Sequence, residues 1–154
     1  MNIRKANIND INIILDLDFH FTSEYKNFEK IQDVSWSKKF GKKYYENLIL
    51  NEENFDVILA DIDGKIVGYM EVEHNYIEEE FRKEIISKII EFYVIKEYRD
   101  KGIGSKLFDF FQKEAKSKGS TMISIYTNLE NIKAQNFYET HGFTKRAVIM
   151  DKKI

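Results

Sequence analysis

Hydrophobic residues recur along this chain with two different periods, and a change of period marks the border between elements. Strand-like runs are apolar throughout or alternate at every second residue; they cover residues 1–6, 54–61, 65–74, 85–95 and 121–127, and a last strand region begins at Phe143. Helical runs repeat every three or four residues; they cover residues 11–19, 35–50, 103–115 and 132–140. The order β-α-α-β-β-β-α-β-α-β predicts an α/β protein.

Short polar signals predict how several of these elements begin and end. Asn9 or Asp10 is the expected N-terminal cap of the first helix, because both side chains accept hydrogen bonds from free backbone amides. Asp-Gly at positions 63–64 predicts a tight hairpin turn, and Gly142 is expected to end the last helix. An aromatic series with helical spacing is expected to pack in the core: Trp36, Phe40 and Tyr44.

The composition limits the classes of function. The chain has 154 residues and a net charge of −2, which suits one domain over residues 1–154 and gives no general attraction for nucleic acid. It has no cysteine, which excludes disulfides, thiolate zinc sites and a cysteine nucleophile. The histidines lack the spacing of metal ligands, so no metal is expected. The N-terminus enters a strand pattern directly and no apolar run reaches membrane-spanning length, so we expect a cytoplasmic protein.

The clearest chemical signal is the turn between the strand at 85–95 and the helix at 103–115. Gly102 and Gly104 leave backbone amides open at a helix N-terminus, where the helix dipole adds partial positive charge. This arrangement predicts a site for a phosphorylated ligand. Full positive charges beside the turn come from Arg99, Lys101 and Lys106. The apolar face of the following helix consists of Ile103, Leu107, Phe108, Phe111 and Ala115.

Two common phosphate-binding motifs do not fit this turn. The string G-x-x-x-x-G-K-[ST] is absent, and Leu107 stands where a dinucleotide-binding turn requires its third glycine. The pattern that remains, R-x-x-G-x-G from Arg99 to Gly104, resembles the acyl-CoA pyrophosphate loop of the GNAT superfamily of N-acetyltransferases. The segment from Asn131 to Phe143 resembles the C-terminal signature of the same family, N-x-x-A-x-x-F-Y-E-x-x-G-F, and the two motifs follow in the expected order.

This resemblance implies a mixed central sheet of six to seven strands with about four helices, and acetyl-CoA as the acyl donor. In the family, the pantetheine arm enters between two splayed strands and pairs with the strand backbone, which here runs from Phe92 to Val94. A backbone amide near Val94 is the expected donor to the thioester oxygen, and Lys96 stands where proline is common. The residues expected to hold acetyl-CoA are Phe92, Tyr93, Val94, Arg99, Asp100, Lys101, Gly102, Ile103, Gly104, Ser105, Lys106, Asn131 and Tyr138.

Tyr138 is the expected catalytic residue, because the resemblance places its hydroxyl near the thioester sulfur, where it can return a proton to the departing thiolate. The alternative for Tyr138 is packing as a buried aromatic. Asn131 is expected to contact the pantetheine, to cap the last helix, or both. Lys88 and Tyr126 occupy the two positions where family members can carry a glutamate as general base. The remaining candidates for that base, besides bulk water, are Glu71 and Glu73, which share one strand face, and Glu91.

The sequence therefore predicts an acetyl-CoA-dependent N-acetyltransferase that moves the acetyl group to a primary amine by direct attack in a ternary complex. A covalent acyl-enzyme is disfavoured, because the chain has no cysteine and no signal for a Ser-His pair. The acceptor is either a small amine, such as a polyamine or aminoglycoside, or a protein N-terminus or lysine; the acidic run at 78–80 favours a cationic acceptor. The alternatives are a non-catalytic acyl-CoA-binding regulatory module and an unrelated nucleotide-phosphate binder. Homodimers are common in the family.

Overall fold

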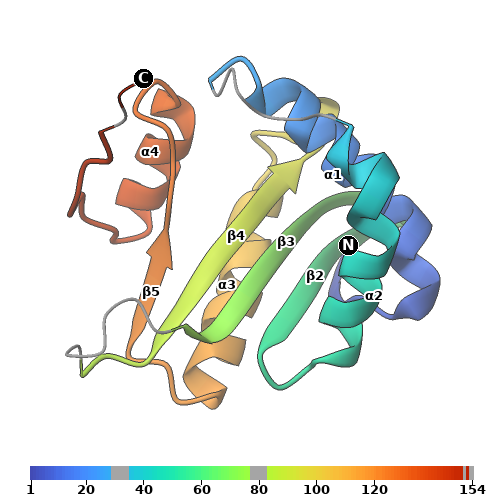
Figure 1. Cartoon of the computed structure of the whole chain (residues 1–154), viewed down its shortest axis with the longest axis horizontal. Helices are drawn as coiled ribbons and strands as arrows, with labels where there is room; N and C mark the ends of the chain where they lie inside the picture. The colour runs from blue at the N-terminus through green and yellow to red at the C-terminus, as the bar shows by residue number, and fades with distance from the viewer. Residues whose placement is uncertain (29–34, 77–82, 151, 153–154) are drawn as a thin grey trace.

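The computed structural model describes residues 1–28, 35–76, 83–150 and 152. The strands form one mixed sheet in the order β1-β2-β3-β4-β5 (Figure 1). Neighbouring strands are antiparallel from β1 to β4, and β4 and β5 are parallel. The strands are β1 (Asn2–Lys5), β2 (Phe55–Ile62), β3 (Lys65–Tyr76), β4 (Ile86–Val94) and β5 (Met122–Ile125).

Helices cover both faces of this sheet (Figure 1). On one face, Ile14 and Leu17 of the first helix pack with Tyr45 of the second. On the other face, Leu107 and Phe111 of the third helix pack against the sheet, and each such side chain contributes about 2 kcal/mol when removed from water. The α-helices of the described chain are α1 (Ile11–Tyr25), α2 (Lys42–Leu50), α3 (Ile103–Ser117) and α4 (Ile132–Thr140), and the short helices are η1 (Ile8–Asp10), η2 (Ser37–Gly41) and η3 (Lys96–Tyr98).

Local signals predicted several of these elements correctly. The bounds of α4 are those expected, and all five residues assigned to the apolar face of α3 are buried. Asp63 and Gly64 have φ angles of 53° and 84°, which are the left-handed conformations of a two-residue hairpin loop. Gly142, with a φ of 86°, follows the end of α4, and the Phe143 N–H donates to the Tyr138 carbonyl.

The strand expected from Phe143 is not formed, so the prediction of six to seven strands is wrong over the described residues, which form a five-stranded sheet. Residues 143–150 run beside α4, away from β4 (Figure 1). A strand forms only where its backbone hydrogen-bonds to a neighbour, and this segment does not join the edge at β5. The mixed sheet with four α-helices is confirmed.

The structure corrects two local predictions in the N-terminal part of the chain. Trp36 and Phe40 are 38% and 58% exposed rather than part of the core. Phe40 lies in η2 and Trp36 directly precedes it. The Trp36 ring packs against both Phe40 and Tyr44, so the three share a face as their spacing predicts, but that face is open to solvent at Trp36 and Phe40. Asp10 stands at the N-cap position of α1 as expected, but its side chain makes no cap hydrogen bond to α1. Because η1 adds a turn ahead of α1, the side-chain cap is Asn7, and the Asp10 side chain accepts from the Asn7 N–H.

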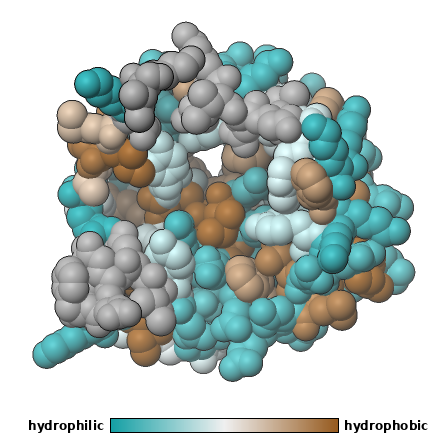
Figure 2. Space-filling model, in the orientation of Figure 1, coloured by the Kyte–Doolittle hydropathy of each residue, from teal (hydrophilic) through white to brown (hydrophobic). Residues whose placement is uncertain are grey.

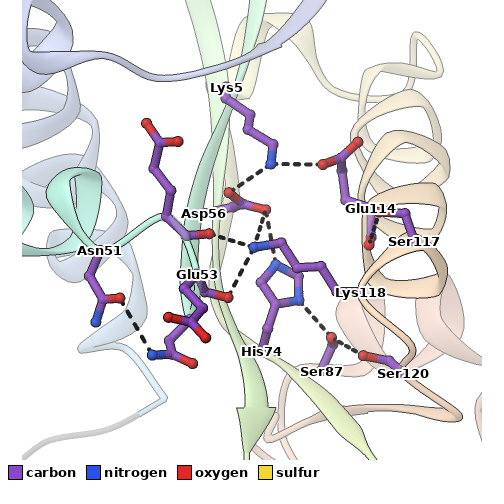
Figure 3. Close-up of polar contacts among 12 residues, drawn as sticks. Lys5, Asn51, Glu53, Asp56, His74, Ser87, Glu114, Ser117, Lys118 and Ser120 are labelled. Carbon is purple, nitrogen blue, oxygen red and sulfur yellow. Dashed lines mark hydrogen bonds and ion pairs between the residues drawn. The ribbon is translucent and has the colours of Figure 1, made fainter.

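A buried polar chain corrects the expectation that no serine pairs with a histidine. The Ser87 Oγ lies 2.7 Å from His74 Nδ1, and His74 Nε2 lies 2.9 Å from Asp56 Oδ2 (Figure 3). Ser87 also lies 2.6 Å from the Ser120 hydroxyl. Ser87 and His74 are buried at 0% and 1% exposure and lie outside the cavities at the β4–β5 edge, so this chain joins strands rather than serving as a nucleophile.

Asp56 is the acidic centre of this polar chain, and its loss is expected to destabilise the fold. Burial raises the pKa of Asp56, but the hydrogen bond to His74 and the ion pair with Lys5, at 3.0 Å, outweigh it and hold the pKa below its usual value. Asp56→Ala should lower the free energy of unfolding by about 3–5 kcal/mol, because it leaves Lys5 and His74 without their buried acceptor. Chemical denaturation measures this loss, and a wild-type midpoint for the variant would contradict it. The contribution is present at neutral pH and is lost as the pH falls through the lowered pKa.

Candidate active site

The sheet opens where β4 and β5 separate. Their parallel register covers residues 86–89 of β4 and 122–125 of β5, whereas β4 continues to Val94. At the same point the register of β4 with β3 skips Ile90, which is the extra residue of a β-bulge. A bulge bends its strand, so this bulge explains why β4 leaves β5 here.

Beyond the bulge, two residues of β4 turn their backbone groups toward the opening. Alternate residues of an antiparallel pair bond to the neighbouring strand, and the Ile95 N–H donates to the Val67 carbonyl of β3. Phe92 and Val94 are out of phase with Ile95, so their amides and carbonyls face away from β3. The Val94 carbonyl accepts from Arg99 Nε at 2.7 Å, which leaves the Val94 N–H as the candidate donor to a thioester oxygen.

Two adjoining cavities occupy the opening, and Figure 2 shows this face of the molecule hollowed between α1 and α4. The larger cavity, of about 1020 Å³, extends along β4 from the turn that contains Gly102 and Gly104, which we call the glycine turn. The smaller, of about 410 Å³, is lined by Lys88, Glu91 and Tyr126. The side chains that line both cavities are Phe21, Tyr25, Phe92, Asn131, Ala134 and Tyr138.

The glycine turn lines the larger cavity, and each of its two positions requires glycine for a different physical reason. Gly102 immediately precedes α3 and has a φ of 76°, a conformation that other residues adopt only with strain. A Cβ on Gly104 would lie 3.3 Å from the Phe137 ring and 3.4 Å from the Phe92 ring. The two glycines therefore allow the first turn of α3 to present its amides to the cavity, as the sequence predicts for a diphosphate site.

Two of the three basic side chains of this turn are engaged by protein groups, and one of them is Lys101, whose Nζ donates to the Glu97 carbonyl at 2.9 Å. Arg99 Nη2 lies 2.7 Å from Glu24 of α1, and the Tyr93 hydroxyl donates to the same carboxylate at 2.7 Å. Arg99 thus joins β4 to α1 at the wall of the larger cavity. Lys133 of α4 forms an ion pair of 2.9 Å with Asp100 beside the turn.

Tyr138 and Asn131 lie where the two cavities meet. Tyr138 is 7% exposed, and burial raises the pKa of its hydroxyl well above the usual value. The hydroxyl is therefore protonated at neutral pH and can donate to a group in the cavity. Asn131 caps α4, since its side-chain oxygen accepts from the Ala134 N–H at 3.2 Å, and it lines the cavities as well.

Two of the three candidate bases meet, and the third lies apart. Glu71 and Glu91 are register partners on β3 and β4. Glu91 receives hydrogen bonds from the hydroxyls of Tyr69 and Tyr45 and lines the smaller cavity. Glu73 is paired in register with Lys88 and lines neither cavity. Glu91 is therefore the carboxylate best placed to reach a ligand.

Sequence reasoning missed Glu24 and Lys133. Glu24 contacts Arg99 across 75 positions of the chain, and no local pattern signals such a pair. Lys133 lies inside the C-terminal signature, and its ion pair with Asp100 shows that this signature packs beside the glycine turn. The sequence shows the two motifs but not that contact between them. The acidic run at 78–80 lies outside the described residues.

Comparison with known proteins gives evidence that is independent of this geometry. A relative from Archaeoglobus fulgidus, an uncharacterized N-acetyltransferase, is 26% identical over 145 residues, which are 94% of each chain. An uncharacterized N-acetyltransferase from Methanocaldococcus jannaschii is 26% identical over 96% of this chain, and the match spans only 62% of the length of that relative.

None of the helices in the described part of the chain has the length and apolar character needed to cross a membrane.

Solved structures share the fold. A mutant of the BH1408 protein from Bacillus halodurans superposes with a TM-score of 0.87 at 18% identity, covering 100% of this chain and 99% of that one. The aminoglycoside 6'-N-acetyltransferase AAC(6')-IG from Acinetobacter haemolyticus gives a TM-score of 0.76 at 20% identity, covering 100% and 99%. The profile of the Acetyltransferase (GNAT) family matches residues 20–143, which include both motifs and the opening between β4 and β5. This chain belongs to the GNAT acetyltransferase family.

Proposed function

We propose that this chain is an acetyl-CoA-dependent N-acetyltransferase in which a primary amine attacks the thioester directly. Family membership implies an acyl-CoA donor. The observation that carries the proposal is the opening between β4 and β5, where the Val94 backbone, Tyr138 and Glu91 approach one continuous space. An acyl donor, a proton donor and a proton acceptor are what acetyl transfer to an amine requires.

The larger cavity is lined by groups that can hold coenzyme A. The first-turn amides of α3, from Ile103 to Ser105, would hold the diphosphate, with Lys106 in the same turn and Lys101 just before it. Bare backbone at Gly102 and Gly104 keeps that approach open. Phe92 and Val94 would pair with the amide groups of the pantetheine arm. When bound, acetyl-CoA supplies an activated thioester carbonyl.

Three groups around the opening are assigned the remaining roles: a donor to the attacked oxygen, a donor to the departing sulfur and an acceptor of the ammonium proton. The Val94 N–H stabilises negative charge on the attacked carbonyl oxygen, and losing such a donor costs on the order of 3 kcal/mol of transition-state stabilisation. Burial raises the pKa of Tyr138, so its hydroxyl stays protonated at neutral pH and donates a hydrogen bond to the departing sulfur. Glu91 is assigned the proton of the acceptor ammonium, since its carboxyl group lines the smaller cavity.

The acceptor is a primary amine that arrives as a cation. The smaller cavity is lined by the carboxyl group of Glu91 and by the rings of Phe21, Tyr25 and Tyr126, with Lys88 on the same lining. The carboxyl group and the ring faces can hold the ammonium group of such an acceptor. Small polyamines, aminoglycosides and peptide amines all present this group.

Thiol release from acetyl-CoA across a panel of polyamines, aminoglycosides and N-terminal and lysine peptides tests the proposal, with coenzyme A binding measured by calorimetry in parallel. We expect one-to-one binding of coenzyme A and release of thiol with one amine class. Binding without release across the panel would favour a non-catalytic acyl-CoA-binding module. A protein that does not bind coenzyme A would contradict the proposal.

Tyr138→Phe is expected to lower the turnover number well over tenfold while the affinity for coenzyme A stays unchanged. The variant keeps the ring that packs beside Phe137 and Phe143 and loses only the hydroxyl that would stabilise the leaving thiolate. Phe143→Leu, which alters the same packing without touching the hydroxyl, serves as the control. Wild-type turnover in Tyr138→Phe would remove Tyr138 from the mechanism.

A further inference from the structure

Asp18 is a buried carboxyl group that the acetyl-transfer mechanism above does not use. It lies on α1 and is 2% exposed. The Thr22 hydroxyl donates to its Oδ1 at 3.2 Å, and its Oδ2 has no hydrogen-bond partner among the described residues. The carboxyl of Glu91 is close enough to hydrogen-bond with it. Two carboxyl groups bond to each other only when one of them carries a proton.

Glu71 adds a third carboxyl to this pair. It is 1% exposed, one of its oxygens accepts from the Tyr44 hydroxyl, and its Oε2 has no partner among the described residues. Glu91 is its register partner, and the Tyr45 hydroxyl interacts with both glutamates. The three carboxyls therefore come from α1, β3 and β4 to one buried place.

Among the described residues, the surroundings of the three carboxyls supply hydroxyls and no neutralising cation. The groups that face the three carboxyls are Thr22 of α1, Ser37 of η2, Tyr44 and Tyr45 of α2, and Tyr69 of β3. None of the ion pairs between described residues joins a lysine or arginine to any of the three. Burial raises the pKa of each carboxyl, that of Glu71 to about 7, and the mutual repulsion raises the pKa of Glu91 further. Three such groups cannot all be ionised at neutral pH.

We propose that Asp18, Glu71 and Glu91 share their protons as one cluster, and that Asp18 and Glu71 take up the proton that Glu91 removes from the acceptor ammonium. This inference rests on the proposed function. Glu91 accepts the N–H proton, and the bonding pair stays on nitrogen for the attack. Because the Asp18–Glu91 pair already holds one proton, one oxygen of Glu91 gives that proton up as its other oxygen accepts the new one. The released proton goes to the Asp18 carboxylate directly, or to Glu71 through the Tyr45 hydroxyl, which accepts one proton as it donates another. Asp18 and Glu71 act through Glu91 and are positioning residues.

Stability against pH tests the shared protons without any substrate. The folded state holds protons that the unfolded chain releases near pH 4, so wild-type stability should fall as the pH rises from about 5 through the raised pKa of Glu71, about 7. Asp18→Asn and Glu71→Gln each remove one such group and should flatten this fall, with a higher melting temperature than wild type at the alkaline end. Glu73→Gln, two residues along the same strand from Glu71, should keep the wild-type slope. Equal slopes in all four proteins would overturn the cluster.

The pH dependence of thiol release tests the use of the cluster in the reaction. Asp18→Asn removes the negative neighbour of Glu91, so the acidic limb of the rate profile should move down by about one pH unit at saturating acetyl-CoA. A purely structural defect would lower the rate equally at every pH, and an unmoved midpoint would overturn the proton role. If the wild-type protein releases no thiol with any amine, the proposed function fails, while the stability measurement still decides whether the cluster shares protons.

Discussion

Gly102→Glu is expected to abolish the binding of coenzyme A. The new carboxylate would project from the residue that immediately precedes α3, where the diphosphate is proposed to lie. One negative charge about 5 Å from a doubly charged diphosphate, at an effective dielectric constant of about 40, costs roughly 3 kcal/mol, or on the order of 100-fold in affinity. Strain at the φ of 76° adds to the loss. Isothermal titration calorimetry with coenzyme A measures the effect.

Gly119 provides a matched control just beyond the opposite end of the same helix. It has a φ of 82° and, like Gly102, no neighbouring atom within 4 Å of the point where a Cβ would lie, but it lies outside both cavities. Gly119→Glu should therefore suffer the same backbone strain and still bind coenzyme A as wild type does. Gly102→Asn, which tolerates a positive φ and adds no charge, should bind with an intermediate affinity. Wild-type affinity in Gly102→Glu would rule out this turn as the diphosphate site.

Glu91→Gln is expected to lower the rate of thiol release by about 100-fold, the usual contribution of a positioned general base. The amide keeps the size and the hydrogen bonds from Tyr69 and Tyr45 but cannot accept the ammonium proton. Because Glu91 lines the smaller cavity, the affinity for coenzyme A in the larger one should stay unchanged. Steady-state thiol release at saturating acetyl-CoA, with calorimetry in parallel, separates the two effects.

The pH dependence of the residual rate identifies where the base lies. If Glu91 is the base, the variant should recover as the pH approaches the range in which the free amine becomes abundant, near pH 10 for an alkylamine. Glu73→Gln should behave as wild type, since Glu73 lines neither cavity. A full rate in Glu91→Gln near neutral pH would transfer the role to another group or to bulk water.

Local chemistry made the turn and the helices predictable. The two glycines, the helix that follows them and the end of α4 at Gly142 each depend on residues a few positions apart, and each appears where the sequence indicated. The expected aromatic core around Trp36 was wrong because helical spacing shows that Trp36, Phe40 and Tyr44 share a face, but not whether another element covers that face. The prediction of a strand after Phe143 was wrong because the alternation of apolar residues does not show whether the edge of a sheet lies near enough for pairing.

The acidic cluster could not be predicted in full. The pattern on β3 and β4 suggested Glu71 and Glu91 as candidates, yet Asp18 is, in the sequence, one polar residue on an amphipathic helix. Its burial follows only from the way α1 lies across the sheet, which brings residues from three elements together. The same limit hid the pairing of Ser87 with His74 and of Glu24 with Arg99.

Amide NMR spectra recorded during a titration with coenzyme A test the central claim most directly. The amides of Phe92 and Val94 and those from Gly102 to Ser105 should shift together and saturate at one equivalent. The amides of His74 and Ser87, in the polar chain away from both cavities, should stay in place. Shifts confined to another part of the chain, or no shifts at all, would contradict the assignment of the opening between β4 and β5 as the acetyl-CoA site.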